Sequence, residues 1–317
     1  MKKGLLILIV ALLAAPALLT AGGAREETSM PQVAVCLPGS VEFFSVMRVG
    51  MDKAAKEFGL KLIYSDADWK PDVQLSQVEN FVAQGVDVVM LCAGDPQALM
   101  PAIDVCREGG VPLITFTNTL GPNPDGTYEG IETFVGINDK VNGKLLGEMA
   151  HALLGDRKAD IVLIEGAPGT AGQRLRTEGF TEEISKYPYK IVYSQTIEGW
   201  SKEGALAAME AFLQTEQNVD MVASHWHAGA AAAAQALEEA GIAKNVAIAG
   251  IEFSHELKEL ITAGKVHMTT NPSISGMGYT AVETTAKFLA GEKIPRAISI
   301  VPEIVTTENV GSHNPEL

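Results

Sequence analysis

Short apolar runs and helical patterns alternate along this chain about ten times, and this alternation limits the fold more than any other feature. The apolar runs are continuous, as at 33–37 and 86–91, which is typical of strands covered on both faces. Such alternation predicts an α/β fold with parallel sheets and helices on each side. We expect strands at 33–37, 61–64, 86–91, 111–116, 133–135, 161–165, 190–196, 219–223, 245–249 and 266–270.

Glycine and proline mark several helix ends between these strands. Gly59 closes a helix that begins near Phe44, at a position that favours the left-handed conformation. Pro71 opens the next helix, where its missing N–H costs nothing. Asp95-Pro96 should form the cap and first turn of a third helix that ends at Gly109-Gly110. The later helices are expected at 139–154, 174–186, 201–214, 228–240, 254–262 and 275–290.

Two blocks of alternation flank a loop at 121–130 that is rich in Gly, Pro and Asn. The length of 317 residues exceeds one average domain and fits about two. The sequence therefore predicts two doubly wound parallel-sheet lobes. In such sheets ligands bind at the carboxyl ends of the strands, so residues just after each strand are the first candidates for a site.

The N-terminus has the order of features of a secretory signal. Lys2 and Lys3 precede an apolar run at 5–19, and the small residues at 22–24 follow it. The run is shorter than the roughly 20 residues that span a bilayer. We expect a signal peptide at 1–24, a mature chain that starts near Arg25, and a periplasmic or other extracytoplasmic location.

Composition and motifs exclude several classes of function. The formal net charge of −15 argues against nucleic acid, whose phosphates attract clustered Lys and Arg. The three cysteines have no spacing typical of zinc, and we expect them to be unpaired core residues. The Gly-rich stretch at 165–176 lacks both a P-loop and a dinucleotide fingerprint. No Gly-x-Ser-x-Gly elbow occurs either, so we expect no cofactor, no metal and no enzymatic activity.

Candidate ligand-binding residues follow strands in the first block. Phe43 and Phe44 are adjacent at a helix start, so both cannot face the same core, and one ring is available to stack on a sugar. The alternative is that both rings belong to the core. Thr117 and Asn118 end the fourth strand as short hydrogen-bonding groups, although both residue types also favour turns for local reasons.

The second block supplies a further set of candidates. Arg174 and Arg176 lie on different helix faces, so one of them can reach a ligand. Trp200 and Trp226 follow consecutive strands, and His227 comes next to Trp226. Two histidines at i and i+2 are weak evidence for a metal. Glu252 follows the strand at 245–249 and can accept bonds from two neighbouring hydroxyls, or it can serve as an acid at a helix start.

Taken together, these residues resemble the ribose-binding-like class of periplasmic solute-binding proteins. The resemblance covers nearly the whole mature chain. Its most specific pieces are Phe43-Phe44, the stretch from Gly169-Thr170 to Phe180, and the helix ending at Ala240-Gly241 followed by 246–250. It implies two lobes joined by a multi-strand hinge, with a first lobe at 25–136 and 272–297 and a second at 137–271 and 298–317.

The resemblance also implies which residues bind the ligand. Phe43, Phe44, Arg176 and Trp200 match positions that bind sugar in the family. Glu252 replaces a family Asp, Trp226 replaces an Asn, and the hinge glutamine falls near Asn271 or Pro272. His227 completes the candidates.

The largest departure from the family is at Thr117 and Asn118, which replace a charged Asp-Arg pair that grips sugar hydroxyls. Two neutral groups form weaker hydrogen bonds than that pair. The resemblance therefore implies a ligand other than ribose, bound at a more aromatic and less charged site.

The implied function is capture of a small sugar or polyol by hinge closure, for an ABC permease and its ATPase, by a monomer. A cyclitol, a sugar acid or a quorum-signal furanose are alternative ligands. An alternative role is presentation of the ligand to a chemoreceptor or other membrane sensor.

Overall fold

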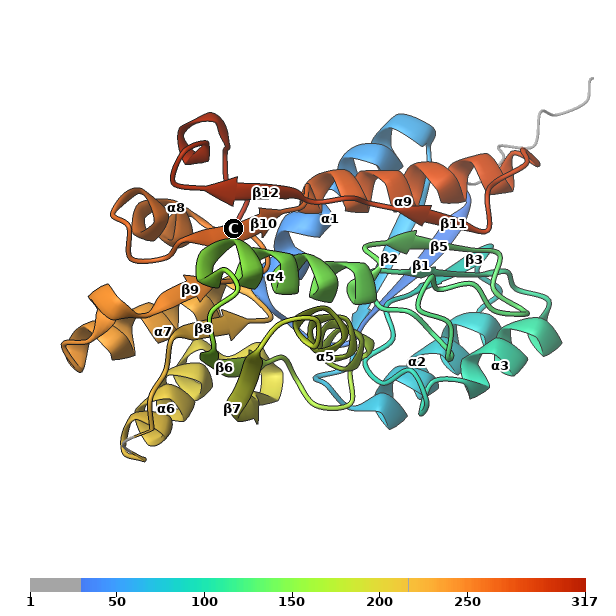
Figure 1. Ribbon diagram of the computed structural model, residues 1–317. Helices are drawn as coiled ribbons and strands as arrows, with labels where there is room; N and C mark the ends of the chain where they lie inside the picture. The colour runs from blue at the N-terminus through green and yellow to red at the C-terminus, as the bar shows by residue number, and fades with distance from the viewer. Residues whose placement is uncertain (1–29, 216) are drawn as a thin grey trace, which may run out of the picture. The chain divides into compact units, whose positions relative to one another are not determined.

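The computed structural model describes residues 30–215 and 217–317, which form two six-stranded sheets (Figure 1). The first sheet has the order β11-β5-β4-β3-β1-β2 and the second the order β12-β10-β9-β8-β6-β7. The first contains β1 (Gln32–Leu37), β2 (Lys61–Asp66), β3 (Val88–Leu91), β4 (Leu113–Phe116), β5 (Thr133–Gly136) and β11 (Ala297–Ser299). The second contains β6 (Ala159–Glu165), β7 (Tyr189–Thr196), β8 (Met221–Ser224), β9 (Ala247–Ala249), β10 (Met268–Asn271) and β12 (Glu303–Thr306).

Nearly all of these strands run parallel, as the continuous apolar runs predict. β12 is antiparallel to β10, and the other strand pairs in the described residues are parallel. The predicted architecture of two doubly wound parallel-sheet lobes is confirmed. The predicted signal peptide at 1–24 lies outside the described residues.

Helices cover both faces of each sheet. Those on the first sheet are α1 (Glu42–Phe58), α2 (Pro71–Ala83), α3 (Pro101–Gly109) and α9 (Ile274–Leu289). Those on the second are α4 (Asp139–Leu154), α5 (Ala171–Ile184), α6 (Lys202–Leu213), α7 (His227–Glu239) and α8 (His255–Thr262). None of the helices in the described part of the chain combines the length and the apolar character that a bilayer span requires.

The alternation of side chains along β1 shows how one strand serves two cores. Val33 and Val35 pack with residues of α1 and α9, whereas Ala34 and Cys36 face α2 and α3 on the opposite side of the sheet (Figure 1). Residues 33–36 are fully buried. Because successive side chains of a strand point to opposite faces, a strand between two helix layers must be apolar throughout.

Three segments connect the sheets: one between β5 and α4, one between β10 and α9, and one between β11 and β12. The boundaries expected at 136–137 and 271–272 fall in the first two. In the third, Ile298 and Ser299 still pair with Val135 and Gly136 of the first sheet. The strand therefore continues two residues beyond the expected boundary at 297.

The local helix signals are confirmed at two positions and wrong at a third. Gly59 ends α1 with a left-handed φ of 70°, and Pro71 is the first residue of α2. The third helix, α3, begins at Pro101 and not at Asp95. The Asp95 carboxylate accepts hydrogen bonds from the N–H groups of Gln97 and Ala98, at 2.8 and 2.9 Å, and closes a separate turn. A helix running through Pro101 would place its ring against a carbonyl of the preceding turn.

Candidate functional site

A cavity of about 310 Å³ is lined by residues of both lobes, and we call it the interlobe cavity. It is bordered by the loops and helix starts that follow the carboxyl ends of β1, β2, β4, β7, β8 and β9, the edge where ligands bind in doubly wound sheets. The first lobe contributes Val41, Glu42, Phe43, Phe44, Trp69, Thr117 and Asn118. The second lobe contributes Arg176, Gly199, Trp200, Ser201, Trp226, His227, Ala228 and Glu252.

The structure brings nine of the ten sequence-predicted site residues to this cavity, namely Phe43, Phe44, Thr117, Asn118, Arg176, Trp200, Trp226, His227 and Glu252. Asn271 lies elsewhere. It ends β10 opposite Glu303 of β12, and it lines a separate hollow with Pro272 and Ser273.

The two adjacent phenylalanines have different surroundings. Phe44 is 6% exposed and belongs to the core beneath α1, whereas Phe43 is only partly buried against that core. Their ring centroids are 5.5 Å apart and the rings are nearly perpendicular, at 89°. Phe43 therefore has the freer ring face for contact with a ligand.

Thr117 and Asn118 already use part of their hydrogen-bonding capacity within the first lobe. The Thr117 hydroxyl donates to the Met47 sulfur at 3.5 Å, and the Asn118 amide donates to the Ala93 carbonyl at 2.8 Å. Thr117 also has a left-handed φ of 60°. Because Ala93 uses only one of the two amide N–H groups of Asn118, the second N–H and the carbonyl oxygen remain for a ligand.

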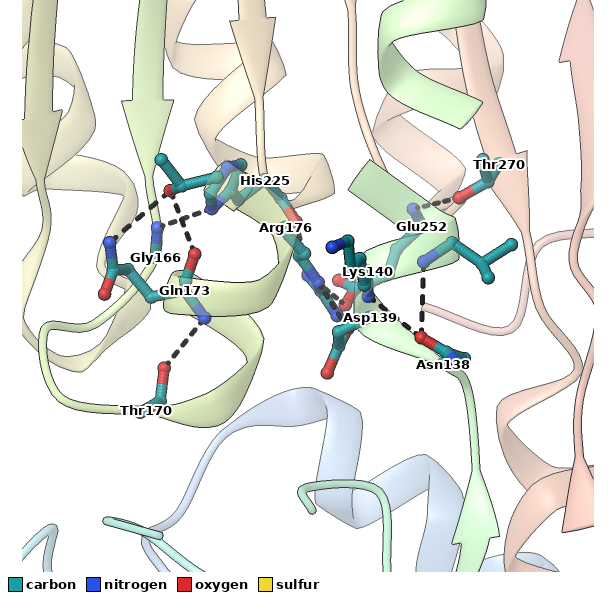
Figure 2. A network of polar contacts seen from close by, with 12 residues as sticks. Asn138, Asp139, Lys140, Gly166, Thr170, Gln173, Arg176, His225, Glu252 and Thr270 are labelled. Carbon is teal, nitrogen blue, oxygen red and sulfur yellow. Dashed lines mark hydrogen bonds and ion pairs between the residues drawn. The ribbon is translucent and has the colours of Figure 1, made fainter. Parts of the chain in front are cut away.

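Arg176 is the central charged group of the site, and the packing of α4 against α5 holds it there. Its Nε donates to Asp139 Oδ1 at 2.7 Å, and its Nη1 donates to the carbonyl of His225 (Figure 2). Glu252 Oε1 lies 3.7 Å from Nη1. Burial alone would lower the pKa of Arg176, but the charges of Asp139 and Glu252 outweigh it and raise that pKa. The guanidinium therefore stays charged, with its orientation set by Asp139.

The turn that precedes α5 caps the start of that helix. Thr170 is the N-cap of α5, and its hydroxyl accepts a hydrogen bond from the N–H of Gln173 at 3.1 Å (Figure 2). Such a cap satisfies one of the free donors of the first turn. The Gly169-Thr170 turn thereby fixes the direction in which α5 carries Arg176 toward the interlobe cavity.

Two tryptophans form a corner of the cavity beside Arg176. The ring centroids of Trp200 and Trp226 are 5.6 Å apart in an edge-to-face arrangement. The Arg176 guanidinium lies 5.4 Å from the centroid of the Trp200 ring, within the range of a cation–π contact. Trp226 is 3% exposed, and its indole N–H has no hydrogen-bond partner among the described residues.

The histidines next to Trp226 are neutral at neutral pH. Burial lowers the pKa of His227 to about 4, and burial together with the Arg176 charge lowers that of His225 well below its usual range. His225 Nδ1 accepts a hydrogen bond from the N–H of Gly166 at 3.3 Å. Within the described residues no group of three or more His, Cys, Asp or Glu side chains is placed to hold a metal ion.

Glu252 is a buried acid with a strained backbone. It is 7% exposed and has a left-handed φ of 72°. Burial raises its pKa to about 7; the Arg176 charge opposes this shift and the Asp139 charge adds to it. Near neutral pH the carboxyl is therefore close to its titration point, and a ligand hydroxyl that donates to it would favour the charged form.

Glu252→Gln should change how stability depends on pH. The folded protein holds this proton more tightly than the unfolded chain, because the pKa rises from 4.5 to about 7 on folding. The contribution of protonated Glu252 to the free energy of unfolding is full below pH 4.5, and it is lost as pH rises through 7. We expect the unfolding free energy of wild type to fall relative to that of the variant across this window, as measured by urea unfolding followed by circular dichroism.

The exposed Glu259 on α8 provides the control for this experiment. Glu259→Gln should leave the wild-type pH profile unchanged. Parallel profiles for wild type and Glu252→Gln would contradict a raised pKa at Glu252.

Trp69 and Asp139 are two of the residues that sequence reasoning missed at this site. Trp69 lines the interlobe cavity just beyond β2. Tryptophan is scarce in this chain, and this scarcity could have identified Trp69 as a candidate. Asp139 begins α4 and bonds Arg176 while it is 3% exposed. Its signal was an acidic residue directly after the segment that crosses between the lobes.

Comparisons with known proteins agree with this arrangement. A family model described as periplasmic binding protein domain matches residues 33–293. The ribose import binding protein of Bacillus subtilis is 28% identical over 260 residues, which cover 81% of this chain and 81% of that protein.

Solved structures resemble the chain over most of its length. An ABC transporter solute binding protein from Bacillus halodurans with bound myo-inositol has a TM-score of 0.83 and 26% identity, covering 90% of this chain and 98% of that one. A periplasmic solute binding protein from Actinobacillus succinogenes with bound D-allose has a TM-score of 0.79 and 26% identity, covering 89% and 100%. The chain therefore belongs to the periplasmic binding protein domain family, as a ribose-binding-like member of type I.

Proposed function

We propose that this protein is the solute-binding component of an ABC importer and captures a small sugar or polyol in the interlobe cavity. The observation that carries the proposal is the meeting of Arg176, Glu252 and several aromatic rings from both lobes around one cavity. Rings match the C–H faces of a sugar, and the charged groups match its hydroxyls. Family members are binding proteins, and we extend this role, without turnover of the ligand, to the present chain.

The lobes proposed for this mechanism are 25–136 with 272–299 and 137–271 with 300–317, because residues 298 and 299 pair within the first sheet. We propose that the lobes move by hinge closure and enclose a ligand bound between them. We propose that the protein acts in the periplasm as a monomer, after removal of residues 1–24. The closed form would deliver its ligand to a membrane permease driven by an ATPase.

The choice of ligand class has support from both the cavity and the relatives. Both lobes offer rings, Phe43 and Trp69 from the first and Trp200 from the second, while the charged Arg176 and Glu252 come from the second lobe. This mixture suits a molecule with both C–H faces and hydroxyl groups. The two solved relatives hold myo-inositol and D-allose, so a cyclitol and a hexose are the first compounds to test.

Calorimetric titration of the purified mature protein tests the proposal. The panel should contain D-ribose, D-allose, D-glucose and myo-inositol together with their open-chain alcohols. We expect saturable heat for at least one member, at one ligand per chain. If no member of either class gives saturable heat or a thermal shift at millimolar concentration, capture of a sugar or polyol is refuted.

A further inference from the structure

Residues 313–317 run from the second lobe to the first. On the second lobe, Lys258 Nζ of α8 donates to the His313 carbonyl at 2.6 Å, and His313 Nε2 lies 3.0 Å from Glu303 Oε2 of β12. On the first lobe, the side chain of Leu317 is 5% exposed and belongs to the core that α1 and α9 form with the first sheet. We call residues 313–317 the strap, because they are fastened to both lobes.

The strap completes the start of α9 in the first lobe. Ser273 caps this helix, and its hydroxyl accepts a hydrogen bond from the N–H of Gly276 at 3.2 Å. The carboxylate of Glu316 accepts hydrogen bonds from the N–H of Ser275 at 2.8 Å and from the Ser275 hydroxyl at 2.7 Å. An acid at this place satisfies a free donor of the first turn and suits the positive end of the helix dipole.

The strap also completes the start of α8 in the second lobe. Ser254 caps this helix, and its hydroxyl accepts a hydrogen bond from the N–H of Leu257 at 3.1 Å. The N–H of His255, the first residue of α8, donates to the backbone oxygen of Leu317 at 2.7 Å. Two adjacent strap residues, Glu316 and Leu317, therefore satisfy free donors at the starts of two helices, one in each lobe.

The strap lies beside two of the segments that connect the sheets. A hollow of about 340 Å³ is bordered by 271–273 of one connecting segment, by Ile300 and Val301 of another, and by Asn314 and Glu316 of the strap. In a hinge motion the connecting segments absorb the change of angle between the lobes. Contacts that span both lobes at this place must change when the angle changes.

The contacts of the strap belong to an arrangement in which the lobes meet. Residues of both lobes line the interlobe cavity. In addition, a Cβ atom at Gly169 of the second lobe would lie 3.5 Å from the Asp95 carboxylate of the first lobe, at ordinary contact distance. We call this the closed arrangement. The strap contacts add to its stability, relative to an arrangement in which the lobes have separated.

We propose that the strap is a fourth connection between the lobes, which favours the closed arrangement and so raises the affinity for ligand. This inference rests on the hinge closure of the proposed function. When a ligand needs the closed arrangement, its apparent affinity falls with the fraction of chains that adopt this arrangement. Loss of a strap contact should therefore weaken binding, although residues 313–317 do not line the interlobe cavity in the described chain.

His255→Pro breaks the contact between the strap and α8 and leaves the cavity residues unchanged. Proline has no N–H to donate to Leu317, yet it is tolerated at the first residue of a helix. Ser254 before it is already extended, with φ −110° and ψ 166°, as a residue before proline requires. His255→Ala is the matched control, because it removes the same exposed side chain and keeps the N–H. Thermal melts establish that both variants are folded.

Small-angle X-ray scattering tests the strap without any ligand. We expect a larger ligand-free radius of gyration for His255→Pro than for wild type and His255→Ala. For the compound of the sugar and polyol panel that wild type binds most tightly, calorimetry should give an affinity about fivefold lower in His255→Pro, the effect of one hydrogen bond. Glu316→Ala should lower this affinity by about tenfold, because its hydrogen bonds are charge-assisted. The exposed Glu308→Ala should bind as wild type does.

The outcomes separate the strap from the proposed function. A ligand-free radius in His255→Pro equal to that in His255→Ala would overturn the strap as a connection that holds the lobes, whatever the affinities. A higher affinity in His255→Pro would show that the strap favours separated lobes and would overturn its direction. A larger radius in His255→Pro, in a protein that binds no member of the panel, would support the hold of the strap on the lobes and refute solute capture.

Discussion

Replacing Arg176 with alanine should abolish ligand binding and lower the unfolding free energy by about 3–5 kcal/mol. The guanidinium is 9% exposed and bonds the buried Asp139 at 2.7 Å, with Glu252 at 3.7 Å. Its removal leaves two buried carboxyl groups without their cation, which is the costly way to break a buried ion pair. Urea unfolding followed by circular dichroism measures the loss of stability, and calorimetric titration measures the loss of binding.

Arg174 provides a matched control on the same helix. It is 45% exposed, and its nearest carboxylate oxygen, on Glu178, lies 3.9 Å away. Exposed pairs of this kind contribute about 0–1 kcal/mol, so Arg174→Ala should leave both stability and affinity close to wild type. Equal effects of the two substitutions would show that Arg176 has no special role in the site.

The second large effect is expected at Asp139, which acts through Arg176. Asp139→Asn keeps the size of the side chain but removes the charge that holds the guanidinium. We expect affinity to fall by about tenfold or more, because charge-assisted hydrogen bonds are roughly twice as strong as neutral ones. The pKa of Glu252 should fall as well, since the Asp139 charge contributes to raising it. A pH series of the unfolding free energy measures this shift.

The exposed Asp72 in the first turn of α2 is the control for this substitution. Asp72→Asn changes the same residue type at a similar helix position in the other lobe, and it should affect neither binding nor the pH series. A weaker affinity in Asp139→Asn with an unmoved Glu252 titration would mean that Asp139 is only a structural residue.

The fold could be predicted from the sequence because its main signal is local. A run such as 33–37 must be buried on both faces, and this requirement holds wherever the strand lies in the sheet. The start of α3 could not be placed as well. Asp95-Pro96 has the composition of a helix cap, but Asp95 closes a separate turn, and Pro101 supplies the actual start. Two competing signals six residues apart cannot be ranked without the tertiary structure.

At the candidate site, residues could be predicted where their position in the sequence relative to a strand was enough, and not where tertiary structure decided their place. Residues such as Trp200 and Glu252 were found because they directly follow strands, and strand ends meet at one edge of a sheet. Trp69 follows the end of β2 as closely as Trp200 follows the end of β7, so the same rule could have found it. Asn271 was placed by resemblance alone, and its position against Glu303 depends on the pairing of β10 with β12.

The chain contains three tryptophans, Trp69, Trp200 and Trp226, and all of them line the interlobe cavity. Indole emission under ultraviolet light therefore arises from the cavity alone, with no background from distant tryptophans. A bound ligand would change the solvent contact of Trp69 and Trp200, which are only partly buried, whereas Trp226 is already buried. The unlabelled protein should thus serve as its own optical sensor, with an emission shift that follows occupancy of the cavity.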